Sequence, residues 1–217
     1  MSVFVAPAPK SPATLTYLEL RKAVGFIAIG LPFGVALPRL ILRHSLEGSI
    51  SAYYYTSSRD LFVGSLCAIA MFLLCCRGFD TKDLIAGGLA ALFALGVAFF
   101  PMKPEDATPT EKVIGHVHVI AATLLFSTLA VFCLWLFKMT AHGVHLTQKK
   151  IERNRVYTLC GWVIVGSMVA IGLCRMFNIT AILGVGPWLI FETTALWAFG
   201  FAWLTKGEFI LKDESES

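Results

Sequence analysis

Residues 114–138 read IGHVHVIAATLLFSTLAVFCLWLFK, a stretch with no Asp, Glu or Arg and a single Lys at its end. A helix crosses the hydrocarbon layer of a bilayer, about 30 Å thick, with roughly 20 apolar residues. The stretch therefore predicts a membrane-spanning helix. Similar stretches lie at about 23–42, 59–77, 83–101, 157–175 and 185–205. Together they predict an all-helical polytopic membrane protein, a bundle of six transmembrane helices.

The composition excludes a soluble globular enzyme. Of the 217 residues, 57% are hydrophobic and 15% are charged, whereas about a quarter of the residues of a soluble domain are charged. A core of this size has too little volume to hide so much apolar surface from water. The connections between the six stretches are short, so we expect consecutive helices to be antiparallel neighbours. No phosphate-binding loop, dinucleotide-binding or hydrolase motif is present, which leaves an enzymatic activity uncertain.

Basic residues predict the orientation of the chain. With the N-terminus in the cytoplasm, 12 of the 18 Lys and Arg residues fall on the cytoplasmic side. This bias favours cytoplasmic termini. We therefore expect a cytoplasmic segment over residues 1–22, a membrane domain over 23–205 and a cytoplasmic tail over 206–217. The short first segment has no apolar run of its own, so no cleaved signal peptide is expected.

The basic residues 148–155 are predicted to form the loop between the fourth and fifth helices. Such a juxtamembrane run is usually an orientation signal that also touches anionic lipid headgroups. The net charge of +4 comes largely from this loop. The charge therefore indicates the lipid bilayer as the partner and gives no indication of nucleic-acid binding.

Several helix boundaries and contacts follow from local sequence. Thr108 and Glu111 have the spacing of a capping box with Pro109 between them, and residues 57–60 have the same spacing. Gly186 and Pro187 predict the start of the sixth helix. Small residues allow close approach of helices in a membrane, and Gly30 and Gly34 form a GxxxG pair in the first helix. The 6 cysteines lack metal-ligand or CxxC spacing and are interpreted as small apolar residues without a disulfide framework.

Ionisable residues inside a predicted span are costly and require a reason. The candidates all fall in the outer half of the membrane, where we predict a water-accessible vestibule that binds a small solute. These candidate binding residues are Glu192, His118, Asp60, His116, Arg59 and Arg39. The hydroxyl-rich residues 44–58 are expected to cover the vestibule. The expected partners of the Glu192 carboxyl are His118, Arg39 or Arg59.

Each candidate also has a simpler interpretation. Asp60 would complete a capping box with Ser57. Tyr53, Tyr54 and Tyr55 would lie at the membrane interface, as tyrosines often do. His116 and His118 are separated by about 200° around a helix, so one should face the bundle and both cannot bind one metal ion. We expect no metal site and no cofactor.

Two motifs carry a resemblance. Residues 49–56, SISAYYYT, are followed by Arg59 and Asp60, and residues 191–200 read FETTALWAFG. With these motifs the chain resembles a family of small bacterial six-span membrane proteins, a domain of unknown function, from about residue 20 to 208. The polar residues are also faintly similar to those of the CREST membrane hydrolases, which hold zinc with Ser, Asp and His. The chain differs from these hydrolases by having six predicted spans instead of seven and no HxxxH pair.

Three hypotheses on function follow. In the first, the vestibule binds or transports a small solute, proton or cation at Glu192, with His118 and Asp60 assisting. In the second, the same three residues form a metal-dependent membrane hydrolase or lipid-modifying enzyme. In the third, the protein has a structural or partner-binding role and these side chains only satisfy one another.

Overall fold

The computed structural model describes residues 16–76, 81–140 and 147–212. Within these ranges the chain forms six α-helices and two short 3₁₀ helices, called η. In chain order they are α1 (Tyr17–Arg43), η1 (Ser51–Tyr55), α2 (Arg59–Cys75), α3 (Thr81–Phe99), α4 (Pro109–Leu134), η2 (Leu136–Lys138), α5 (Gln148–Met176) and α6 (Pro187–Lys206). Residues 1–15 and 213–217 of the predicted terminal segments, and Lys10 and Arg77 of the orientation count, lie outside the described residues.

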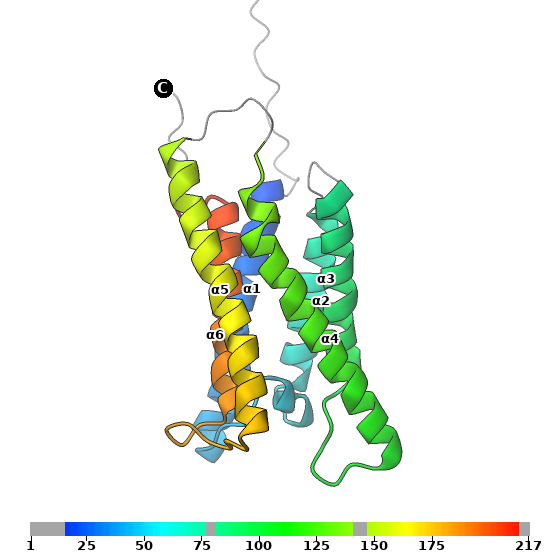
Figure 1. Cartoon of the computed structure of the whole chain (residues 1–217). Helices are drawn as coiled ribbons and strands as arrows, with labels where there is room; N and C mark the ends of the chain where they lie inside the picture. The colour runs from blue at the N-terminus through cyan, green and yellow to red at the C-terminus, as the bar shows by residue number, and fades with distance from the viewer. Residues whose placement is uncertain (1–15, 77–80, 141–146, 213–217) are drawn as a thin grey trace, which may run out of the picture.

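The six α-helices lie side by side and alternate in direction (Figure 1). Each helix packs against the next one along the chain, and α6 returns to pack against α1, so the helices close into a ring. The expected antiparallel neighbours are confirmed. We call the end of the bundle where α1 begins and α6 ends the terminal end, and the opposite end, which holds η1, the η1 end.

The all-helical class is confirmed for the described residues, where the bridge between Ile182 and Val185 is isolated and no strand forms. Four helical segments are long and apolar enough to cross a membrane: α1, α3, Pro109–Lys138 and α5. α2 and α6 are not among these four segments. α2 is shorter, with 17 residues. α6 has 20 residues, but Glu192 and three tryptophans reduce its mean hydropathy.

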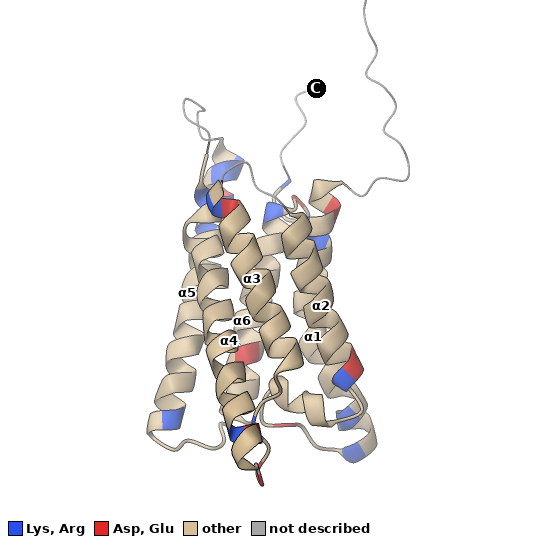
Figure 2. Cartoon of the chain, turned by 90° about the vertical axis from the view of Figure 1, so that its right-hand side faces the viewer, with Lys and Arg blue, Asp and Glu red and all other residues tan. Residues whose placement is uncertain are grey.

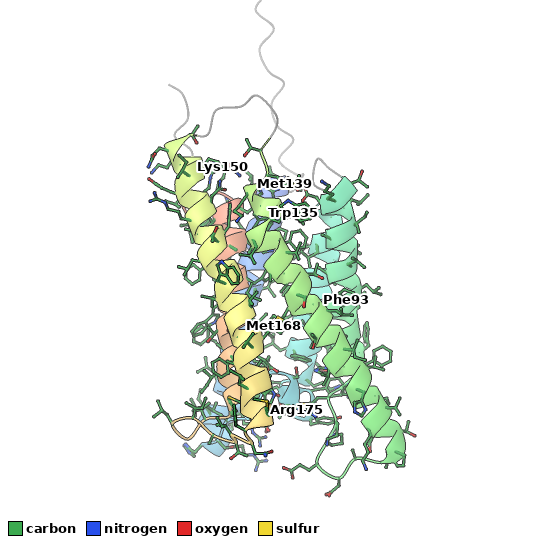
Figure 3. The ribbon with its side chains drawn as sticks, in the orientation of Figure 1. Phe93, Trp135, Met139, Lys150, Met168 and Arg175 are labelled. Atoms are coloured by element: carbon green, nitrogen blue, oxygen red, sulfur yellow. The ribbon has the colours of Figure 1, made fainter. Side chains whose placement is uncertain are left out.

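The outer surface suits lipid. Large apolar side chains such as Phe26, Leu92 and Trp162 are exposed on the sides of the helices. Lys and Arg lie toward the two ends of the bundle, and the middle of the ribbon is mostly uncharged (Figure 2). In Figure 3, Lys150 lies at the terminal end, Phe93 and Met168 lie halfway along, and Arg175 lies at the η1 end.

Two helices begin earlier than predicted. α1 begins at Tyr17 because Thr16 and Glu19 form a capping box, in which the Thr16 N–H donates to Glu19 Oε2 at 2.7 Å. α5 begins at Gln148, with the Thr147 hydroxyl oxygen accepting from the Lys150 N–H at 3.1 Å. The prediction of a loop over residues 148–155 is therefore wrong, because this basic run forms the first turns of α5.

The predicted helix starts have mixed outcomes. The Thr108–Glu111 capping box is confirmed, and Gly186 and Pro187 begin α6 as expected. The capping box of Ser57 with Asp60 is wrong. α2 begins after Ser58, whose hydroxyl makes no capping bond. That hydroxyl donates instead to the Val35 carbonyl of α1 at 3.0 Å and ties the two helices together.

α1 and α6 approach each other closely at Gly25 and Gly200. A Cβ added to Gly25 would lie 2.9 Å from the Gly200 carbonyl oxygen, and a Cβ added to Gly200 would lie 2.9 Å from the Gly25 carbonyl oxygen. Of the predicted GxxxG pair, Gly34 contacts Leu61 of α2, and Gly30 has open space around it. Small residues do mediate helix packing here, but the pair that brings α1 and α6 together is formed across the chain.

Candidate functional site

An open cavity of about 910 Å³ lies at the η1 end. Its walls come from the segment that joins α1 to η1, from η1 itself, from the loop between α3 and α4, and from the nearby ends of α4, α5 and α6. Three predicted site residues line it: Glu192, His118 and His116. The structure thus brings these three together, although they come from α4 and α6.

Glu192 binds the segment that crosses the start of α6. The Ile50 N–H donates to Glu192 Oε2 at 2.7 Å, and the Leu189 N–H donates to the Gly48 carbonyl at 2.9 Å. The first N–H groups of a helix have no partner within the helix, and Gly48 supplies one. Glu192 lies deep in the protein but keeps partial exposure toward the cavity. We call residues 48–55 the η1 segment. The Glu192 carboxylate therefore both anchors the η1 segment and forms part of the cavity wall.

Gly186 makes this crossing possible. A Cβ at Gly186 would lie 2.5 Å from the Gly48 carbonyl oxygen and 2.7 Å from the Gly48 Cα. The obstruction is backbone, which cannot move aside as the end of a long side chain can. A residue without a Cβ is required at the point where the start of α6 meets the η1 segment.

His118 holds the end of α3. The residue is 4% exposed, and its Nδ1 lies 2.7 Å from the Phe100 carbonyl oxygen. Because a carbonyl only accepts, Nδ1 is the donor and Nε2 is an acceptor in the neutral ring. α3 ends at Phe99, and the carbonyls at the C-terminus of a helix have no N–H partner within the helix. His118 supplies a donor for the carbonyl of Phe100, the residue that follows α3.

His116 and His118 occupy different faces of α4. His118 is buried and His116 is exposed at the cavity. This confirms that only one of the two histidines faces the bundle. Within the described residues, no group of three or more His, Cys, Asp or Glu side chains is placed to hold a metal ion.

The remaining candidates lie outside the cavity wall. Arg39 forms an ion pair with Glu47 at 2.7 Å, and Glu47 itself lines the cavity. Arg59 donates to the Tyr54 hydroxyl at 2.6 Å and lies over the Tyr54 ring. Asp60 is exposed in the first turn of α2, where the helix dipole favours an acid.

Two expectations are thereby corrected. The Glu192 carboxylate takes a backbone N–H, whereas His118, Arg39 and Arg59 bond to other groups. A backbone partner was overlooked because sequence alone does not show which loop amide reaches α6. Asp60 also does not join Glu192 and His118 in the cavity wall, because it begins a helix on the outside of the ring.

The tyrosine-rich segment covers one side of the cavity. Tyr55 lines it and donates its hydroxyl to the Met102 carbonyl at 2.7 Å. Tyr53 is fully buried, and its hydroxyl oxygen accepts from the Glu47 N–H at 3.3 Å. Burial raises the pKa of the Tyr53 phenol above its usual value, which keeps it neutral. Tyr54 lies beside Arg59, which donates to its hydroxyl.

Sequence reasoning missed most of the charged lining. These residues are Glu47, Lys103, Glu105, Asp106 and Lys112. Arg175, which the sequence places in the same outer half, lines the cavity from the end of α5. The sequence contains one signal of this loop: Pro101 and Pro104 interrupt the helical pattern between α3 and α4. The loop folds back onto α4 so closely that a Cβ on Gly115 would lie 2.6 Å from the Lys103 Cβ. This fold-back places charges of both signs at the cavity.

Comparisons with family models, with curated proteins and with solved structures find no match to this chain. The resemblance to the six-span family, drawn from residues 49–56 and 191–200, and the similarity of the polar residues to those of the CREST hydrolases therefore stay predictions.

Proposed function

We propose that this chain is a bacterial inner-membrane protein that crosses the membrane six times, with both termini in the cytoplasm. The cavity at its η1 end opens to the outer side and binds a small polar solute or cation. The alternating directions of the helices and the larger number of Lys and Arg at the terminal end support this topology (Figure 2).

One observation carries the binding role: a carboxylate within the predicted sixth span, Glu192, faces an open cavity. Ionisable residues at such positions are costly and typically mark substrate or ion pathways. The cavity volume of about 910 Å³ is within the range of small-molecule sites. Its lining combines Glu47, Glu192 and Arg175, so that both ends of a dipolar solute find an opposite charge.

A structural role is the second candidate, and a specific observation favours it. Both Glu192 and His118 bond to backbone groups of neighbouring segments. In this alternative the two side chains only hold the walls of the bundle in place. The metal-dependent hydrolase is less well supported because Asp60, its third residue, does not line the cavity.

Thiol labelling tests the binding role. Ala52 lines the cavity and Ser57 is exposed just outside its wall. We would introduce Ala52→Cys or Ser57→Cys, together with Cys75→Ser to remove an exposed native thiol. An impermeant maleimide added to intact cells should modify both positions. Glycine betaine, choline, acetate or sodium ion would then be screened in the millimolar range for slower labelling.

Binding in the cavity predicts that at least one of these probes protects Ala52→Cys while Ser57→Cys reacts at an unchanged rate. A structural role predicts that none of these probes changes the labelling rate of either position. If Ala52→Cys does not react from the outer side at all, the open vestibule itself is disproved.

A further inference from the structure

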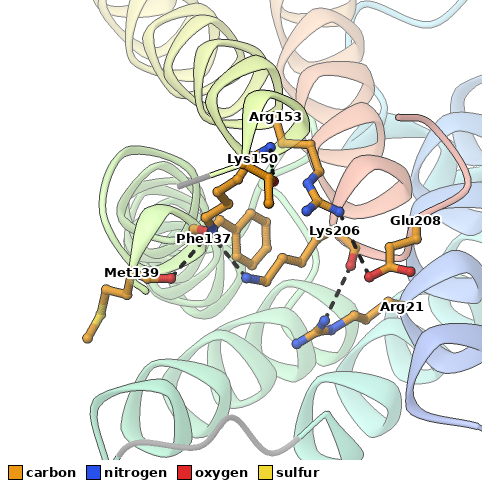
Figure 4. A network of polar contacts seen from close by, with 8 residues as sticks. Arg21, Phe137, Met139, Lys150, Arg153, Lys206 and Glu208 are labelled. Carbon is orange, nitrogen blue, oxygen red and sulfur yellow. Dashed lines mark hydrogen bonds and ion pairs between the residues drawn. The ribbon is translucent and has the colours of Figure 1, made fainter. Parts of the chain in front are cut away.

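The cavity lies at the end of the bundle where α4 and α5 separate. Toward the terminal end the two helices are held together, because Lys150 Nζ of α5 donates at 3.0 Å to the Phe137 carbonyl of η2, which follows α4 (Figure 4). A Cβ added to Gly161 of α5 would lie 2.5 Å from the Leu134 side chain of α4. Figure 1 shows the two helices diverging from the middle of the bundle toward the η1 end.

The face of α4 that meets α5 becomes more exposed toward the η1 end. Cys133 belongs to this face, because its Cβ would lie 3.2 Å from a Cβ added to Gly161. Cys133 and Ala130 are buried, with exposures of 0% and 5%. Thr123 and Val119 precede Ala130 by about two and three helical turns and so lie on the same face. Thr123 is exposed, and Val119 is 50% exposed.

The facing surface of α5 changes in the same way. Gly172 follows Gly161 by about three helical turns and so lies on the same face. A Cβ added to Gly172 would meet nothing within 4 Å, and Gly172 is exposed. We call Val119 and Thr123 of α4 and Gly172 of α5 the lateral opening. These residues lie within the predicted spans, so in the proposed topology the lateral opening faces the hydrocarbon of the membrane.

The cavity and the lateral opening are continuous. Val119 belongs to both, and Arg175, about one turn beyond Gly172, lines the cavity from α5. The cavity therefore has charged walls on one side and borders an apolar surface on another. A solute made only of polar groups matches the charged walls but not the apolar side. A molecule with a polar headgroup and an apolar chain matches both.

We propose that the cavity binds the headgroup of a zwitterionic phospholipid of the outer leaflet, with an acyl chain in the lateral opening. The proposal rests on the binding role and the orientation proposed above and names the class of ligand. The Glu192 carboxylate offers an acceptor to the ammonium group, and the Arg175 guanidinium donates charge-assisted hydrogen bonds to the phosphate. The chain covers Val119 and Gly172 and stays out of water. A lipid of the leaflet reaches the site sideways, between α4 and α5.

Thiol labelling of the purified full chain in maltoside detergent tests the proposal. Val119→Cys reports on the lateral opening and Ala52→Cys on the cavity, each combined with Cys75→Ser. The probes are oleoyl lysophosphatidylethanolamine and glycerophosphoethanolamine, which is the same headgroup without a chain. We expect the lysolipid to slow the reaction with N-ethylmaleimide at both positions, roughly fivefold at a concentration of about four times its Kd, because the thiol reacts in the unbound protein. Glycerophosphoethanolamine at the same concentration should change neither rate.

Ile120→Cys is the matched control. Ile120 is 59% exposed and does not line the cavity, because it points about 100° away from Val119 around the helix. The lysolipid should leave its labelling rate unchanged. Equal slowing of Ile120→Cys and Val119→Cys would indicate general coverage of the helix by lysolipid and would overturn the proposal. Thr123→Cys replaces Val119→Cys as the reporter if that variant does not fold.

The headgroup is tested with oleoyl lysophosphatidylglycerol, which has the phosphate but no ammonium group. It should protect Ala52→Cys less well than lysophosphatidylethanolamine, because it offers Glu192 no cation. Equal protection by the two lysolipids overturns the zwitterionic headgroup.

Failure of this proposal is distinguishable from failure of the binding role. If glycerophosphoethanolamine protects Ala52→Cys as well as its lysolipid does, the cavity binds a polar solute without a chain. The same conclusion follows if the lysolipids protect neither position while glycine betaine or another of the earlier probes protects Ala52→Cys. In both cases the binding role stands and the phospholipid is excluded. If no probe of either kind protects Ala52→Cys, both proposals fail.

Discussion

Glu192 stabilises the η1 end through the Ile50 N–H, which is buried and bonded to its carboxylate at 2.7 Å. Glu192→Leu leaves this N–H without an acceptor and should reduce the free energy of unfolding by about 2 kcal/mol. Glu192→Gln keeps an amide oxygen as acceptor and should cost less. Unfolding by denaturant in detergent micelles gives the order wild type, Gln, Leu. Equal stability of all three would show that the bond contributes nothing.

The same variants should change local dynamics. Hydrogen exchange of residues 48–56 should accelerate most in Glu192→Leu, because the segment loses its anchor on α6. Exchange in α3 serves as the internal reference, because the Glu192 carboxylate bonds to the Ile50 N–H and not to α3. Acceleration spread over all helices would indicate global loosening instead of a released segment.

His118 offers a matched comparison with its neighbour on the same helix. His118→Phe removes the donor to the Phe100 carbonyl and should cost about 1 kcal/mol of unfolding free energy. His116→Phe alters an exposed ring at the cavity and should leave stability near that of the wild type. The same denaturant measurement checks both. A larger loss for His116→Phe would contradict the assignment of His118 as the tie between α3 and α4.

At the scale of elements, the contact of α1 with α6 depends on glycine. Gly25→Ala places a Cβ 2.7 Å from Leu204 Cγ and 2.9 Å from the Gly200 carbonyl oxygen. Such overpacking should cost about 1–3 kcal/mol. Gly30→Ala, in the same helix but with open space around it, should be neutral or slightly stabilising because Ala favours helix. The thermal unfolding midpoints of the two variants in detergent test this contrast.

Local sequence predicted the elements well where the signal itself is local. The Thr108–Glu111 box and the Gly186–Pro187 start were predicted from neighbouring residues and are confirmed. The start of α5 was missed because a polar, basic run is compatible with a loop as well as with a helix that extends beyond the apolar stretch.

Contacts between elements were harder to predict. Gly25 and Gly200 are far apart in the chain, so no spacing rule connects them. The η1 segment is held on α6 by the Ile50 N–H. Every residue except proline has such a group, so the sequence does not show which one bonds to Glu192. The candidate site could therefore be located at one end of the bundle, and Glu192 and His118 could be named, but their partners and most of the charged lining could not.

At the scale of the whole molecule, the proposed topology places the two ends of the bundle on opposite sides of the membrane. Glu105→Cys, at the η1 end, should react with an impermeant maleimide in intact cells. Gln148→Cys, at the terminal end, should react only after lysis. Both positions are exposed, so a difference in rate reports the side of the membrane. The reverse pattern would invert the orientation and assign the cavity to the cytoplasm.

The closed ring has a consequence for biosynthesis. Helices emerge from the ribosome in order, and α6 is the last of the six. α6 supplies the packing surface for α1, the carboxylate for Ile50 and the N–H for the Gly48 carbonyl. A nascent chain halted before residue 187 therefore lacks the groups that hold its first loop in place. The recess at the η1 end is therefore completed only in the final step of insertion, and a truncated translation product does not display it.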